Sequence, residues 1–108
     1  MDLKETKVDN ISIYSISGKL DASNADEFQE KMVSAAKAGQ DRFVFNMEGL
    51  DYISSSGLRA FLAISKAIPG SGFVRFYNIK DQVLEVFTIS GFNTIFQIFE
   101  DRDDALML

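Results

Sequence analysis

The sequence predicts an α/β fold in which helices pack on a mixed, mostly parallel sheet. Short apolar runs typical of buried strands alternate with stretches whose apolar residues recur every three or four positions. The expected order is two strands, then helix and strand in alternation, ending on a helix. Alternation after a first hairpin favours parallel strands joined by helical crossovers. We therefore expect a single domain spanning residues 1–108, with an N-terminal β-hairpin and about four helices.

The first part of the chain predicts a hairpin followed by a helix. Residues 3–8 and 11–17 are the paired strands, with Asn10 in the turn between them. Within 11–17, apolar residues stand at both odd and even positions, which indicates a strand buried on both faces or one with a bulge. Gly18 is expected to end this strand. Asp21 or Ser23 is expected to cap the next helix, which ends before Gly39; its apolar stripe is Ala25, Phe28, Met32, Ala35 and Ala36.

The second part predicts three further strands and helices. A buried strand at residues 42–46 leads through a polar turn at 46–52 into a helix that carries Leu58, Phe61 and Leu62 on one face. Residues 69–72, with one Pro and two Gly, break the pattern before a strand at 73–77. A third helix stops near residues 90–91, an edge strand covers 94–99, and residues 100–108 form a terminal helix.

Three serines and a glycine stand where a strand leads into the second helix: Ser54, Ser55, Ser56 and Gly57. A helix start has unsatisfied backbone N–H groups and a partial positive charge. Serine is a preferred N-cap, so one serine can cap the helix while the others fill a turn. A phosphate would be accommodated at the same place for the same physical reason.

Composition excludes several classes of function. The chain has no His and no Cys, so it lacks a Ser–His–Asp triad, a thiolate nucleophile and the usual zinc ligands. Its net charge is −5 and its Lys and Arg are not clustered, which disfavours nucleic-acid binding. No apolar run is long enough for a membrane span, and no signal peptide is evident. We therefore expect a cytoplasmic protein with neither a membrane nor a nucleic acid as partner.

Catalysis by this chain is not expected either. A Ser–Lys pair is conceivable with Ser55 and Lys66, but eleven residues on one helix separate them by about 15 Å along its axis. A protein-binding module fits the acidic composition better.

Three segments in order resemble the STAS domain, and in particular the single-domain bacterial anti-sigma factor antagonists. They read GKLD at 18–21, DYISSSGLR at 51–59 and ISGF at 89–92. The resemblance covers nearly the full chain, and the Ser-Ser-Gly-Leu segment with its upstream Asp is its most specific part.

The resemblance implies a partner switch. The unphosphorylated antagonist binds an anti-sigma factor that is also a serine kinase, and so releases a sigma factor. The kinase, which holds the ATP, phosphorylates one serine and the complex dissociates; a PP2C-type phosphatase reverses the step. No cofactor is implied for the antagonist itself, and its cell is bacterial.

Residue by residue, the resemblance implies that Ser55 is the phosphorylated serine, with Ser54 and Ser56 as the alternatives. The position of Ser54 is often Asp in the best-known members of the family. The implied partner-binding residues are Asp21, Ser54, Ser55, Ser56, Gly57, Arg59, Gly91 and Phe92. A non-switching STAS scaffold or ligand-sensing module, with the serines acting as helix caps, is the alternative function.

Overall fold

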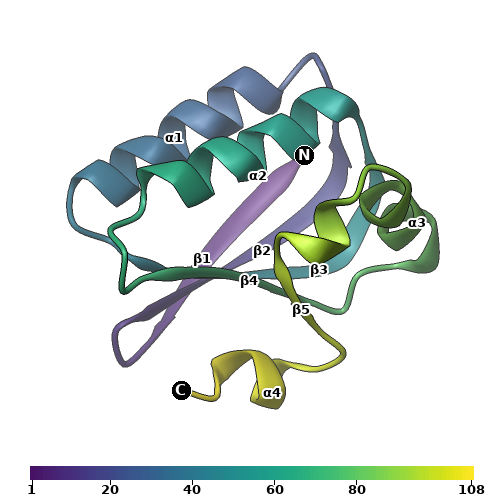
Figure 1. The fold of residues 1–108 in the computed structure, drawn as a ribbon. Coiled ribbons are helices and arrows are strands. Elements are labelled where there is room, and N and C mark those ends of the chain that lie inside the picture. The colour runs from purple at the N-terminus through teal and green to yellow at the C-terminus, as the bar shows by residue number, and fades with distance from the viewer.

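The structure, a computed structural model, describes all 108 residues. It contains one five-stranded sheet whose spatial order follows the chain, and Figure 1 shows it with helices above and below. The first two strands are antiparallel, and each later strand is parallel to the one before it. The strands are β1 (Asp2–Val8), β2 (Ile11–Leu20), β3 (Arg42–Ile53), β4 (Phe73–Tyr77) and β5 (Gln97–Phe99).

The helices follow the predicted alternation. They are α1 (Ala25–Lys37), α2 (Ser55–Ala67), α3 (Asp81–Ile89) and α4 (Arg102–Leu106), with a short 3-10 turn η1 (Phe92–Thr94) after α3. The predicted fold class is confirmed: a mixed sheet with an N-terminal hairpin and four α-helices.

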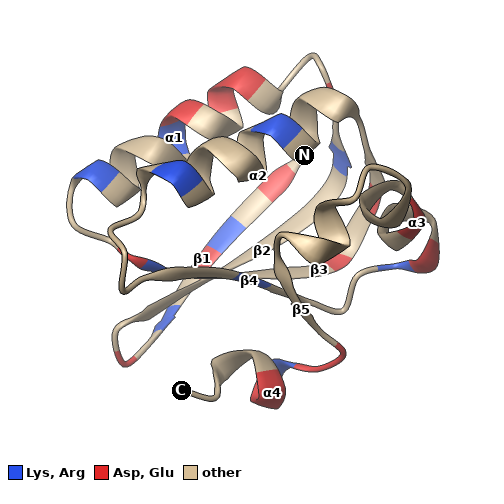
Figure 2. Cartoon of the chain, in the orientation of Figure 1, with Lys and Arg blue, Asp and Glu red and all other residues tan.

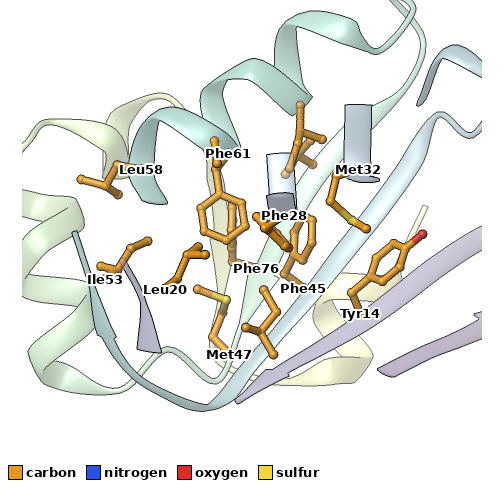
Figure 3. Packing of buried hydrophobic residues seen from close by; sticks show 14 of the residues in the cluster. Tyr14, Leu20, Phe28, Met32, Phe45, Met47, Ile53, Leu58, Phe61 and Phe76 are labelled. Carbon is orange, nitrogen blue, oxygen red and sulfur yellow. The ribbon is translucent and has the colours of Figure 1, made fainter. Parts of the chain in front are cut away.

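The main core lies between the sheet and the layer of α1 and α2, which run side by side over one face (Figure 1). Phe61 of α2 lies at its centre, with its ring centroid 5.0 Å from that of Phe45 and 4.9 Å from that of Phe76 (Figure 3). Phe28 of α1 meets the same ring edge-on at 5.4 Å. This packing fixes α2 on β3 and β4, and with it the position of the serines at its start.

A smaller core covers the opposite face of the sheet under α4. Ile11, Ile13 and Val44 face this side, whereas Tyr14 and Ile16 of the same β2 strand face the main core. The mixed parity predicted for β2 therefore reflects burial on both faces. The register with β3 also shifts between Ser15 and Ser17, so the strand carries an irregularity of the kind expected as the alternative.

Several predicted element boundaries are wrong. The terminal helix expected at 100–108 spans only Arg102–Leu106. Gly18 does not end β2: it has φ +91° inside an irregular stretch, and the strand runs on to Leu20. Residues 46–52 form no turn but continue β3, because backbone pairing with β2 persists as far as Leu20 and Ile53 whatever the polarity of the side chains. The edge strand at 94–99 shrinks to Gln97–Phe99, because η1 takes the chain from Gly91, at φ +77°, through Thr94.

The start of α1 also differs from the prediction, whereas its end agrees. Neither Asp21 nor Ser23 caps the helix; the residue before Ala25 is Asn24, whose side chain bonds elsewhere. The Asp21 carboxylate accepts instead from Ser23. Gly39, with φ +112°, follows the last helical turn as predicted.

Candidate functional site

The candidate site lies at the edge of the sheet where the parallel strands β2 and β3 end. Leu20 and Ile53 are the last paired residues of the two strands, and the backbone N–H of Ser54 donates to the carbonyl of Leu20 at 2.9 Å. The Asp21 loop and the serine turn therefore begin side by side, as expected for loops that follow neighbouring parallel strands.

Ser54 is the N-cap of α2. Its hydroxyl accepts a hydrogen bond from the backbone N–H of Gly57 at 3.3 Å, and its carbonyl accepts from Leu58 at 3.0 Å. The side chain is half-buried. Its hydroxyl is thus already used to satisfy one of the free donors of the helix start.

The two following serines differ in their surroundings. Ser55 is the first helical residue; it is exposed, and its hydroxyl makes no hydrogen bond within the chain. Ser56 is half-buried, and its hydroxyl accepts from Nη2 of Arg59 at 3.1 Å. Of the three hydroxyls, that of Ser55 alone is both exposed and free of intramolecular bonds.

Gly57 allows α2 to approach the strand ends closely. A Cβ at this buried position would lie 2.7 Å from Cγ1 of Ile53 and 3.0 Å from Cγ of Leu20. Figure 3 shows Leu20 and Ile53 near Leu58, beneath the beginning of α2. The absence of a side chain at Gly57 therefore holds the serine turn firmly against the ends of β2 and β3.

The charges around the two helix starts are opposite in character. The first turn of α1 carries Asp26 and Glu27, whereas the first turn of α2 has no acidic residue and is followed by Arg59 (Figure 2). The partial positive charge at the start of α2 is thus not offset by a side chain of its own first turn. Chemically, this site can accept a new negative charge on Ser55.

Asp21 is held in a local turn and does not reach the serines through any hydrogen bond. Its carboxylate accepts from the backbone N–H of Ser23 at 2.9 Å and from the Ser23 hydroxyl. The hydroxyl bond, followed by the backbone bond, lowers the pKa of Asp21 below its ordinary value of 3.8. Asp21 is therefore a fixed negative charge beside the serine turn.

Asn24 is a residue of this edge that the sequence reasoning missed. Its Oδ1 accepts from the backbone N–H of Asp21 at 3.0 Å, and its Nδ2 donates to the carbonyl of Lys19 at 2.9 Å. It thus ties the Asp21 loop to the end of β2. The available signal was an Asn directly before the first helical residue, a position where such side chains commonly bond the backbone.

Gly91 and Phe92 lie after α3. Gly91 adopts the left-handed conformation that ends the helix, and Phe92 is half-buried with its ring 5.7 Å from that of Phe96. Away from the two chain ends, the large apolar side chains that are exposed are Ile89, Ile95 and Tyr52, at 78%, 55% and 49%. The aromatic expected at a partner surface thus packs partly on the core, while its neighbours Ile89 and Ile95 face solvent.

The chain contains no group of three or more side chains that could together hold a metal ion. None of its helices has the length and apolar character that crossing a membrane requires.

Comparison with known proteins identifies the family of this chain. A family model described as the STAS domain matches residues 3–105. The chain belongs to the STAS family. This STAS domain is 34% identical over 106 residues to BtrV, a proposed anti-sigma factor antagonist of Bordetella bronchiseptica, covering 97% of this chain and 91% of the relative. It therefore belongs to the anti-sigma factor antagonist group within that family.

Solved structures show the same fold at low sequence identity. An anti-sigma factor antagonist from Mycobacterium paratuberculosis superposes with a TM-score of 0.88 at 17% identity, covering 97% of this STAS domain and 90% of that chain. The phosphorylated form of the Bacillus cell fate determinant SpoIIAA superposes with a TM-score of 0.74 at 19% identity, covering 95% and 94% of the two chains.

Proposed function

We propose that this protein is a phosphorylation-controlled antagonist of an anti-sigma factor. The unphosphorylated chain binds an anti-sigma factor that is also a serine kinase, and so releases a sigma factor. The kinase transfers the γ-phosphoryl group of its own ATP to the hydroxyl of Ser55, leaving ADP, and the complex dissociates. A PP2C-type phosphatase hydrolyses the phosphoserine, and the cycle takes place in the bacterial cytoplasm.

The observation that carries this proposal is the exposed, unbonded hydroxyl of Ser55 at the first position of α2. A kinase can reach this hydroxyl without breaking a hydrogen bond of the chain. Phosphorylation of Ser54 would remove the cap of α2, and phosphorylation of Ser56 would displace Arg59 from its hydroxyl. Ser55 is therefore favoured over its two neighbours as the acceptor.

The switch follows from charge rather than from refolding. Phosphorylation adds about −1.5 to −2 charges at the start of α2. The free chain accommodates them, because the helix start is positive and Arg59 lies one turn away. At an interface the same group must be desolvated, and a loss of about 3 kcal/mol weakens binding more than 100-fold.

The proposed partner surface surrounds Ser55. Asp21 contributes a fixed negative charge, and Gly57 lets the serine turn pack closely on the ends of β2 and β3. Gly91 and Phe92, with the exposed Ile89, would form the apolar part of the same surface. Apolar side chains beside polar and charged ones match the arrangement of a specific protein interface, which has an apolar core and a polar rim.

Intact-mass analysis tests the assignment of Ser55. The chain is incubated with ATP and, separately, with each serine kinase of the anti-sigma factor type from its own cell. We expect one added phosphoryl group on the wild type and on Ser54→Ala and Ser56→Ala, and none on Ser55→Ala.

A phosphoryl group retained by Ser55→Ala and lost by one of the other variants would move the acceptor to Ser54 or Ser56. Stable binding of a partner without any phosphorylation would contradict the switch and favour the non-switching STAS scaffold or ligand-sensing module.

A further inference from the structure

We propose that a groove between the hairpin and the end of α1 binds a small zwitterion of the amino acid or short-peptide class. The groove has a volume of about 740 Å³, within the range of small-molecule sites. It lies where β3 begins, with Ser12 paired to Phe43, whereas the serine turn lies where β3 ends at Ile53. The proposal therefore concerns a second site and does not depend on the proposed partner switch.

The groove exists because α1 ends in small residues. Ala35, Ala38 and Gly39 line it from above, and none of them has a side chain long enough to cover the strands beneath. Lys31 and Met32 form its side on the preceding turn of the helix. The open floor is made by β1 and β2.

Two buried hydroxyls of β2 form the floor. Ser12 and Tyr14 are only 2% and 3% exposed, and they share one face of the strand. The Tyr14 hydroxyl is already bonded within the chain: it accepts from Nε2 of Gln40 at 2.9 Å and donates to Oε2 of Glu5 at 3.3 Å. Burial is the main cause that raises the pKa of Tyr14, so this hydroxyl stays protonated and neutral.

The hydroxyl of Ser12 has no such partner. Ser12 is buried, and no group of the chain forms a hydrogen bond with its hydroxyl. No side-chain polar atom that is closed off from solvent lacks a partner in this structure, so the Ser12 hydroxyl must reach the groove. A largely buried hydroxyl that lines a groove and has no partner in the chain is available to a ligand.

The hairpin register places opposite charges in neighbouring rows of the floor. Glu5 pairs with Tyr14 across the two strands, and Lys7 pairs with Ser12 in the next row on the same face. Residues two apart on a strand are about 7 Å apart. One row therefore offers a carboxylate, and the other offers an ammonium group next to the unpartnered hydroxyl.

The rest of the lining adds no preference for one sign of charge. Asp9 and Asp41 are balanced by Lys31 and Arg42. A ligand with one charge would meet a group of like sign in one of the two rows, whereas a zwitterion satisfies both. We therefore place its carboxylate on Lys7 and Ser12, and its ammonium group on Glu5.

The test is a titration of the ¹⁵N-labelled full chain, followed by amide chemical shifts. The probes are the standard amino acids and diglycine, with acetate and methylammonium as ligands of a single charge. We expect at least one zwitterion to cause saturable shifts at Lys7, Ser12 and Gln40, while neither single-charge ligand does so at the same concentration.

The hairpin offers matched control variants. Lys4 and Ser15 form a cross-strand pair on the opposite face of the same strands. Lys7→Gln and Ser12→Ala should each weaken binding about tenfold, whereas Lys4→Gln and Ser15→Ala should leave it unchanged. Lys7 is exposed, so Lys7→Gln keeps the test informative even if Ser12→Ala disturbs the fold.

Three results would overturn the proposal. The first is the absence of saturable shifts with any zwitterion up to about 10 mM. The second is equal binding of acetate or methylammonium, which would make the groove a simple ion site. The third is binding by Lys7→Gln that equals that of the wild type.

Discussion

The helices α1 and α2 begin on the same edge of the sheet, after neighbouring parallel strands, yet their starts are built differently. The start of α2 is capped by Ser54 and pressed onto Leu20 and Ile53 through Gly57. The start of α1 has no side-chain cap, and Asn24 bonds back to the end of β2 instead.

Charge separates the two starts further. Asp26 and Glu27 already offset the positive end of α1, whereas the first turn of α2 has no acidic residue and presents an unbonded Ser55 (Figure 2). Two helices that begin on the same edge therefore differ: acidic side chains already offset the positive start of α1, whereas the start of α2 can accept a negative charge.

The close contact beneath α2 should produce the largest effect on stability. In Gly57→Val the new side chain meets Ile53 and Leu20 at distances below normal contact. We expect a loss of roughly 1–3 kcal/mol in the free energy of unfolding, because overpacking a filled site forces strain. Urea denaturation measures it.

Gly70→Val is the matched control, since a Cβ at Gly70 meets nothing within 4 Å. Equal stability of the two variants would show that α2 does not depend on close approach at Gly57.

The cap of α2 should contribute less. Ser54→Ala removes the acceptor for the N–H of Gly57, and we expect a loss of about 1 kcal/mol in the free energy of unfolding. Ser54→Asp should restore it, because Asp caps a helix as well as Ser does. If Ser54→Asp is as unstable as Ser54→Ala in urea denaturation, the hydroxyl acts by something other than capping.

The two hydrogen bonds of Asn24 at the start of α1 should contribute a similar or smaller amount to the free energy of unfolding. Asn24→Ala removes the bonds to the Asp21 N–H and the Lys19 carbonyl. Because both groups are near solvent and water can replace the lost partner, we expect a loss of about 0.5–1 kcal/mol. Hydrogen exchange of the Asp21 amide should accelerate in this variant; protection equal to that of the wild type would contradict the role given to Asn24.

The smallest effect should be the pH dependence of the Asp21 turn. Its folded-state pKa lies below the ordinary value of 3.8, mainly because of the Ser23 hydroxyl. A depressed carboxyl pKa gives a stabilisation that is complete above the unfolded-state pKa and is lost as the pH falls through the folded-state pKa. We expect only a slight loss on acidification, because the hydrogen bonds between Asp21 and Ser23 are exposed to solvent, which weakens their effect.

A titration of the Asp21 side chain by NMR measures this directly. The pKa should rise toward its ordinary value in Ser23→Ala. An unchanged pKa in that variant would mean that the Ser23 hydroxyl is not its cause.

The fold class could be predicted from the sequence because the periodic apolar pattern reports which residues are buried. The long β3 could not, because Asn46, Glu48 and Asp51 make its second half polar while the backbone continues to pair with β2. When the solvent-facing side chains of a strand are polar, the apolar pattern in the sequence no longer identifies that strand.

The site was predictable only in part. The serine turn could be placed at a helix start after a strand, but the sequence could not say which serine caps the helix. That choice depends on where the first turn begins, and it leaves Ser54 as the cap and Ser55 free. The role of Asn24 was missed for the same reason, because α1 begins later than a cap at Asp21 or Ser23 would place it.

The binding affinity of the kinase for Ser55→Asp tests the central claim most directly. Isothermal titration calorimetry would compare wild type, Ser55→Asp and Ser71→Asp; Ser71 is an exposed serine in the turn between α2 and β4. We predict that Ser55→Asp weakens binding about 100-fold or more while Ser71→Asp binds as the wild type does. Binding of Ser55→Asp with wild-type affinity would contradict the account, because a negative charge at the start of α2 would then leave the complex intact.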